Sequence, residues 1–270
     1  MSYGPTDDPA WEEYMTTGID PTGGELGPDF DPVTGRRLDE FVDDDERVVW
    51  QEDEEPDYSE TLPDWAKRPD YIPDRILFFD TETDGLPIEY PDNGSIAPED
   101  WPHIVQLAWL MTDDEGSVLS SGSRIIQPLG FTIPEDAVAI HGITTEYALE
   151  HGEPRKKVMT KFRNVLNKAN LIVAHNIVFD ANVVAAEMAR SGLACDIMYK
   201  NAFCTMVGTT DLCKLPFPND VSPYGNYKWP KLTELHQFLF GKDFSGAHDA
   251  LADVRATARC FWELIHRNLI

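Results

Sequence analysis

Phe78-Phe79-Asp80-Thr81-Glu82-Thr83-Asp84-Gly85 is the stretch that decides how this chain is organised. It closes an apolar run that begins at Arg75, and such a run is typical of a short buried strand. Because side chains on a strand repeat every second residue, Asp80 and Glu82 project from the same face. Two carboxylates at this spacing offer hard oxygen ligands to Mg²⁺ or Mn²⁺. The alternative is a strand that ends in a polar turn, which the Asp84-Gly85 pair also favours.

Length and composition favour one globular core with additional segments. The chain has 270 residues and is 42% hydrophobic. No run approaches the roughly 18 apolar residues of a membrane helix, and the polar stretch 1–10 does not resemble a signal peptide. The four cysteines form no C-x-x-C pair, which argues against a zinc site and favours a reducing compartment. We therefore expect a cytoplasmic protein, in a bacterial or viral host cytoplasm.

The net charge of −26 is unevenly distributed along the chain. Residues 1–70 hold 22 acidic and 5 basic side chains, net −17, whereas the remainder is net −9. At first sight such acidity argues against a nucleic-acid ligand. Several acids in the remainder are candidate metal ligands, however, and bound cations would neutralise them. The acidity is therefore mainly a property of the N-terminal segment.

The composition divides the chain into two parts. Residues 1–70 are rich in Asp, Glu, Pro and Gly and show no sustained period, which predicts an extended or disordered segment. Its few apolar groups allow docking on a partner or on the rest of the protein, and a solvated acidic tail is the alternative. Residues 71–270 have a globular pattern and form the predicted catalytic domain.

Within the globular part, strands and helices alternate in the order of a mixed α/β protein. The turn at 113–116 predicts an antiparallel hairpin between its two flanking strands. We expect strands at 75–80, 104–111, 117–126, 171–174 and 202–205, and helical segments at 133–151, 154–170, 183–191, 230–240 and 250–268.

Three separated segments deliver acids at the end of an element: Asp80 with Glu82, then Asp180, then Asp253 with His248. Four carboxylates can hold two divalent ions that clamp a scissile phosphate, and a neutral imidazole can take the proton of the attacking water. Five residues along a helix turn through about 500°, so His248 and Asp253 cannot share one helical face. We therefore expect His248 on a loop at the helix start. Each residue alone also has an ordinary structural interpretation.

These segments resemble the three motifs of the DEDDh, or DnaQ-like, family of 3′–5′ exonucleases. The matching stretches are Asp80-Thr81-Glu82, 175–180 (His-Asn-Ile-Val-Phe-Asp) and 248–253 (His-Asp-Ala-Leu-Ala-Asp). The family includes polymerase proofreading subunits, RNase T and oligoribonuclease, and the H-x4-D spacing belongs to its histidine variant. The stretches 140–144 and 231–235 also resemble sequences common in the family. The similarity covers about residues 75–269.

The resemblance implies a ribonuclease H-like mixed sheet flanked by helices, two Mg²⁺ or Mn²⁺ ions and release of nucleoside 5′-monophosphates. It assigns the metals to Asp80, Glu82, Asp180 and Asp253, and the general base to His248. Asp84 departs from the Thr or Ser of many members. An acid there either repels phosphate or caps the turn, and we favour the turn. The positions that align with contacts to the terminal nucleotide are Thr83, Leu86, His141, Asn176 and Phe179.

The leading hypothesis is an exonuclease that degrades DNA from the 3′ end, in proofreading or end trimming. Its substrate would be a single-stranded or frayed end, which needs stacking and few phosphate contacts. A DNA polymerase or another replication protein is the expected partner, and residues 1–70 could tether it or cover the cleft. The alternatives are an exoribonuclease, since the reaction centre is the phosphate, and a non-catalytic scaffold.

Overall fold

Strand β1 (Ile76–Thr83) lies at the centre of a five-stranded sheet with the order β3-β2-β1-β4-β5. Its first four residues are fully buried, as the apolar run predicts. The computed structural model describes residues 72–87, 97–217 and 227–270. The acidic segment 1–70, and the middle of the loop that follows β1, lie outside these described residues.

The sheet combines antiparallel and parallel pairing, as the predicted element order requires. β1 pairs antiparallel with β2 (Ile104–Thr112), which forms a hairpin with β3 (Val118–Ile125). The hairpin turn is held by Asp113, whose Oδ1 accepts hydrogen bonds from two backbone amides of the turn. On its other edge, β1 pairs parallel with β4 (Leu171–Ala174), and β4 pairs parallel with β5 (Ala202–Cys204). The predicted hairpin is confirmed.

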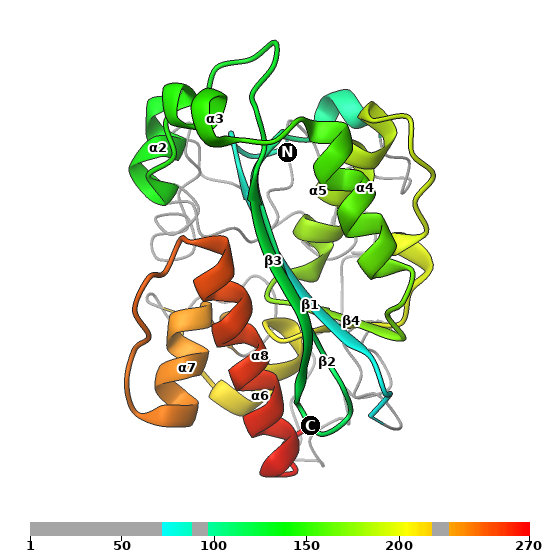
Figure 1. Cartoon of the computed structure of the whole chain (residues 1–270). Coiled ribbons are helices and arrows are strands. Elements are labelled where there is room, and N and C mark those ends of the chain that lie inside the picture. Colours follow the sequence, from blue (N-terminus) through cyan, green and yellow to red (C-terminus); the bar gives the residue numbers. More distant parts are fainter. Residues whose placement is uncertain (1–71, 88–96, 218–226) are drawn as a thin grey trace, which may run out of the picture.

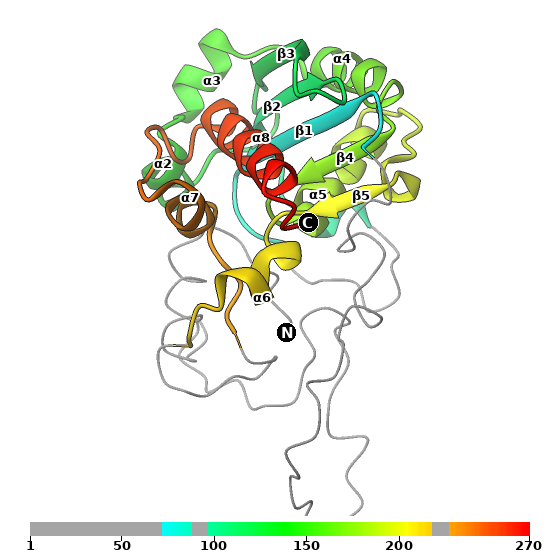
Figure 2. The same ribbon diagram turned by 90° about the horizontal axis from the view of Figure 1, so that it is seen from below.

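Helices cover both faces of the sheet, as Figures 1 and 2 show. One face packs against α7 (Leu232–Phe240) and α8 (Ala250–His266), and the other against α4 (Arg155–Leu166) and α5 (Ile177–Arg190). The alternation of β1 decides which residues meet which layer. Ile76 and Phe78 join the core under α8, whereas Leu77 and Phe79 join the core under α4 and α5.

Aromatic contacts fix α8 on its face of the sheet. The ring of Phe261 in α8 lies edge-on to Phe78 of β1 at 5.4 Å and to Phe203 of β5 at 5.7 Å. All three rings are almost fully buried. Because α8 is anchored over the central strand, its first turn lies above the carboxyl-terminal half of β1, where the acids are.

Several element boundaries differ from the sequence prediction. β1 continues three residues past Asp80, because β2 pairs with it as far as Thr83. The helical region 133–151 is two helices, α2 (Glu135–His141) and α3 (Thr145–His151), separated at Gly142 by a left-handed φ of 73°. α5 begins at Ile177, with two residues between it and the end of β4 at Ala174, and earlier than the predicted start at 183. Short helices not predicted are α6 (Thr210–Cys213) and the 3-10 turns η4 (Pro98–Asp100), η5 (Ile197–Tyr199) and η6 (Val207–Thr209).

The four cysteines are free thiols, and burial raises the pKa of each; for Cys260 the pKa reaches about 12. Such thiols are poor nucleophiles. Among the described helices, none is both long and apolar enough to cross a membrane.

Candidate active site

The face of β1 that packs under α8 also carries the two acids of the first motif. Asp80 and Glu82 follow Ile76 and Phe78 in the same alternation and are half-buried. In the antiparallel register, Asp80 lies opposite Ala108 and Glu82 lies opposite Gln106. The small Ala108 side chain leaves room for α8 to approach this face.

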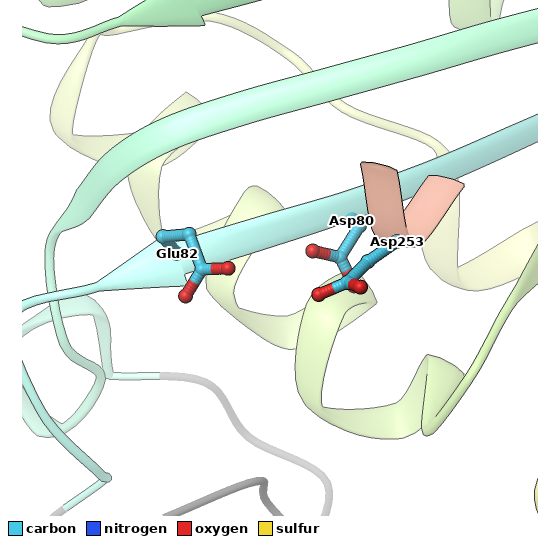
Figure 3. Close-up of side chains that lie close together, drawn as sticks. All are labelled: Asp80, Glu82 and Asp253. Carbon is cyan, nitrogen blue, oxygen red and sulfur yellow. The ribbon is translucent and has the colours of Figure 1, made fainter. Parts of the chain in front are cut away.

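Asp253 reaches the same place from the first turn of α8 and is only 6% exposed. One oxygen from each of Asp80, Glu82 and Asp253 can be chosen so that all three atoms lie within 4.8 Å of one another. Figure 3 shows these carboxylates directed toward the same space between β1 and α8. Three carboxylates gathered from two elements repel one another unless a cation lies between them.

The donor set fits a hard divalent cation. It consists of carboxylate oxygens alone, and no cysteine or histidine takes part in the three-residue cluster. Oxygen-only sites of this kind suit Mg²⁺ or Mn²⁺ better than zinc or copper. The cluster supports the predicted metal chemistry for Asp80, Glu82 and Asp253.

His248 precedes α8, as the spacing argument predicts. Its backbone has a left-handed φ of 69°, and its backbone N–H donates to Asp253 Oδ2 at 3.0 Å. A non-glycine residue in this region costs about 1–3 kcal/mol and persists only where the surroundings hold it. The His248 side chain is half-buried, and its charge is a secondary cause, after burial, of the lowered pKa of His141.

Asp180 approaches from the opposite layer, in the first turn of α5, and is 3% exposed. Its Oδ1 accepts hydrogen bonds from the backbone N–H of Thr81 at 3.0 Å and from Thr81 Oγ1 at 2.7 Å. The reason is the alternation of β1, which turns Thr81 away from Asp80 and toward α5. Asp180 is therefore bonded to the residue between the two acids of β1, and is not part of the cluster within 4.8 Å.

The residues expected to contact the terminal nucleotide have different local surroundings. Asn176 has a left-handed φ of 70° and precedes α5, and Phe179 packs against Trp101 in the core. His141 Nδ1 accepts the backbone N–H of Ile143, and burial lowers the pKa of its imidazole. Of the other two, Thr83 donates its hydroxyl to the Gly85 carbonyl, and Leu86 packs on the core. Their contact with a nucleotide stays a prediction.

Asp84 stabilises the chain around the end of β1. Its Oδ1 accepts the backbone N–H of His103 at 2.7 Å, and its own N–H donates to the His103 carbonyl. Burial raises the pKa of this carboxyl. The turn itself is spanned by Thr83 and Gly85, so the acid serves the junction between β1 and β2. We expected Asp84 to cap the turn before Gly85. The structure gives it a structural role, but its hydrogen-bond partner is His103, 19 residues along the chain, and not a residue of the turn.

Two polar residues, the buried Thr81 and the half-buried His175, were missed in the sequence. Thr81 holds Asp180, as described above. His175 follows β4, and its Nδ1 and Nε2 lie 3.0 Å from Thr205 Oγ1 and 2.9 Å from the Pro230 carbonyl, respectively. Both residues stand inside the motifs that were identified. The feature that could have identified them is a polar side chain within an apolar strand or directly after one. Their bonding partners are distant in sequence, so spacing alone does not reveal them.

Comparison with known proteins identifies the family. The RNase T family model, described as "Exonuclease", matches residues 77–261, which is more than half of the chain. The chain therefore belongs to this exonuclease family, and the resemblance to the DEDDh exonucleases is confirmed.

Two curated relatives carry related sequences. The chain is 25% identical over 193 residues to the 3′-5′ exonuclease DinG of Bacillus subtilis (strain 168), covering 72% of this chain and 18% of DinG. It is 26% identical over 204 residues to the uncharacterized exonuclease CP81 of Escherichia phage 186, covering 73% of this chain and 90% of CP81. This chain thus matches a small part of DinG and nearly all of the phage protein.

Solved structures share the fold. Exonuclease I of E. coli, in complex with a dA16 oligonucleotide, has a TM-score of 0.56 at 23% identity, over 72% of this chain and 41% of that chain. Exonuclease I of Methylocaldum szegediense has a TM-score of 0.55 at 22% identity, over 72% and 41% of the two chains. The predicted ribonuclease H-like sheet flanked by helices is thereby confirmed.

Proposed function

We propose that this chain is a metal-dependent exonuclease that removes nucleotides from the 3′ end of DNA and releases nucleoside 5′-monophosphates. The observation that carries the proposal is the cluster of Asp80, Glu82 and Asp253, with three oxygens within 4.8 Å, next to His248. Family membership gives the exonuclease class. The direction of degradation, the metal and the products belong to the proposal.

The residues divide into metal ligands and a base. Asp80, Glu82 and Asp253 would hold two Mg²⁺ or Mn²⁺ ions together with Asp180. Bound divalent ions lower the pKa of water and stabilise the charge on a leaving 3′-oxygen. His248 would accept the proton of the attacking water. Its position on a loop before α8, rather than within a helix, suits a base that moves toward the bound substrate.

The terminal nucleotide would lie between β1 and the segments that follow it. His141 and Asn176 would contact its sugar and phosphate, and Phe179 and Leu86 would pack against its base, with Thr83 beside them. Burial lowers the pKa of His141 and so favours its neutral form, in which the imidazole can serve as a hydrogen-bond partner without adding charge to the site.

DNA is the preferred substrate class in this proposal. Solved exonuclease I structures that share the fold contain single-stranded DNA oligonucleotides, and this supports a single-stranded 3′ end as ligand. RNA is the second candidate, because hydrolysis occurs at the phosphate in both polymers. We propose proofreading or end trimming as the role, with a DNA polymerase or another replication protein bound through residues 1–70.

The test is a time course of 3′-end degradation in Mg²⁺ and in EDTA. Substrates are single-stranded DNA, paired and 3′-mismatched duplex DNA, and RNA of the same sequence. We expect metal-dependent release of 5′-mononucleotides from DNA, fastest at single-stranded or mismatched ends. Asp80→Ala should abolish it, whereas Asp114→Ala, an exposed acid in the β2–β3 turn, should not. Preference for RNA would refute the assignment of DNA as substrate. Absence of hydrolysis with both Mg²⁺ and Mn²⁺ would refute the proposed nuclease activity.

A further inference from the structure

Gln106 is a polar residue in an otherwise apolar stretch of the sheet. Every residue of β2 is buried, and Gln106 is 6% exposed. In the antiparallel register it lies directly opposite Glu82. Directly opposite side chains project from the same face of a sheet, so the Gln106 amide lies beside Glu82 on the face that α8 covers.

The amide of Gln106 is held by three hydrogen bonds. Its Nε2 donates to Asp249 Oδ2 at 3.2 Å and to Ser123 Oγ at 3.0 Å, and its Oε1 accepts the backbone N–H of Ala250 at 3.2 Å. The Ala250 N–H can only donate, so the oxygen of the amide must face it and the NH₂ group must face Asp249. Both donors and the acceptor of the side chain are thereby used.

These partners form the start of α8. Asp249 is the N-cap of the helix, and its Oδ1 accepts the N–H groups of Leu251 and Ala252. Asp249 and Ala250 directly follow His248, and α8 then delivers Asp253. The buried side chain of Gln106, which lies opposite Glu82 on the sheet, is therefore bonded directly to the start of α8. This helix start presents His248, the proposed base, and Asp253, the third carboxylate.

We propose that Gln106 is a positioning residue of the nuclease site. It fixes the first turn of α8 against the sheet, and so sets how far His248 and Asp253 lie from Asp80 and Glu82. This inference rests on the function proposed above. It assigns Gln106 no contact with substrate or metal.

The amide chemistry explains why an apolar residue would not serve. Without Gln106 the Ala250 N–H is a buried helix-end donor that has lost its acceptor, and Asp249 loses a donor on one of its two oxygens. The helix start would then shift to reach water. A displacement of about 1 Å in a group near the reaction can reduce the rate by about a hundredfold.

Gln106→Met is the direct test, because methionine fills a similar volume without hydrogen bonds. Steady-state kinetics on single-stranded DNA with Mg²⁺ should show kcat reduced at least about tenfold, with KM for DNA changed much less. Ser123→Ala is the matched control, because it removes the third partner of the same amide and leaves both bonds to α8. We expect it to keep kcat near the wild-type value.

A swapped pair separates positioning from simple loss of stability. Gln106→Glu alone directs a carboxylate at the Asp249 carboxylate and places it beside Glu82, and should reduce kcat. Adding Asp249→Asn restores the hydrogen bond in the reverse direction, with the new amide at 249 as donor and the carboxylate at 106 as acceptor. Asparagine is also a good N-cap residue. We expect the double variant to have a higher kcat than Gln106→Glu, because the carboxylate beside Glu82 is present in both and only the contact with residue 249 differs. Melting temperatures confirm that all variants are folded at the assay temperature.

Mn²⁺ affinity, measured by calorimetry, gives a second readout that does not need catalysis. Gln106→Met should bind Mn²⁺ about tenfold more weakly, because Asp253 moves with the helix start, whereas Ser123→Ala should not. Wild-type kcat and wild-type Mn²⁺ affinity in folded Gln106→Met would overturn the inference, as would failure of the double variant to exceed Gln106→Glu in kcat. If the wild-type protein hydrolyses no substrate, the proposed function fails, and the Mn²⁺ titration alone then decides the role of Gln106.

Discussion

Removing one charge from the carboxylate cluster should raise the stability of the metal-free protein. Asp253→Asn keeps an amide oxygen that can accept the His248 N–H, but it eliminates a negative charge close to Asp80 and Glu82. At 4.8 Å and an effective dielectric constant of 20, each pair of like charges repels by about 3.5 kcal/mol. Solvent reduces this value, because Asp80 and Glu82 are only half-buried.

Two further effects oppose the gain. The side chains can rotate apart when no ion is bound, and an acid in the first turn of a helix interacts favourably with the helix dipole by about 0.3–1 kcal/mol. We therefore expect Asp253→Asn to stabilise the protein in EDTA by about 1–3 kcal/mol. For a domain of roughly 150–250 residues, that corresponds to a melting temperature higher by about 2–12 °C.

In Mg²⁺ the wild type should have the higher melting temperature, which reverses the order expected in EDTA. A ligand at 100 times its Kd stabilises the state that binds it by about 2.7 kcal/mol, and the wild type retains all ligands. The assay is thermal unfolding in EDTA and in millimolar Mg²⁺, with Asp114→Asn as a control that makes the same charge change in an exposed turn. Melting of Asp253→Asn below the wild type in EDTA, or an equal Mg²⁺ increment in both, would refute the reasoning.

Two other predictions follow from single contacts. Thr81→Val removes the hydroxyl donor to buried Asp180, so the free energy of unfolding should fall by about 1–2 kcal/mol and exonuclease kcat should fall as well; an unchanged urea midpoint would contradict this. Glu153 is bonded to two lysine ammonium groups, which lower its pKa from 4.5 to about 2. Its stabilisation is therefore present above pH 4.5 and is lost as the pH falls toward 2. Glu153→Gln should cost about 1 kcal/mol at pH 7, and the difference from the wild type in urea titrations should vanish in that acid range; a difference independent of pH would exclude the ion pairs as its source.

The sequence by itself determined the central strand and the pair of acids near its end. The apolar run before Asp80 could only be buried, and the period of a strand placed Asp80 and Glu82 on one face whatever the rest of the fold. The period of a helix likewise excluded His248 from the face of Asp253, and His248 does precede α8. These conclusions needed only local geometry, which a chain carries in its spacing.

Only the tertiary structure decided how the separate motifs meet. The packing of α8 over β1, through Phe261, placed Asp253 close to Asp80 and Glu82. On the opposite face of the same strand, Thr81 forms a hydrogen bond with Asp180. The partners of Gln106 at the start of α8 are 143 and 144 residues away in sequence, and no periodicity relates them to Gln106. Hydrogen bonds between distant segments depend on the order of strands and on which layer each helix joins, and neither is encoded in local spacing.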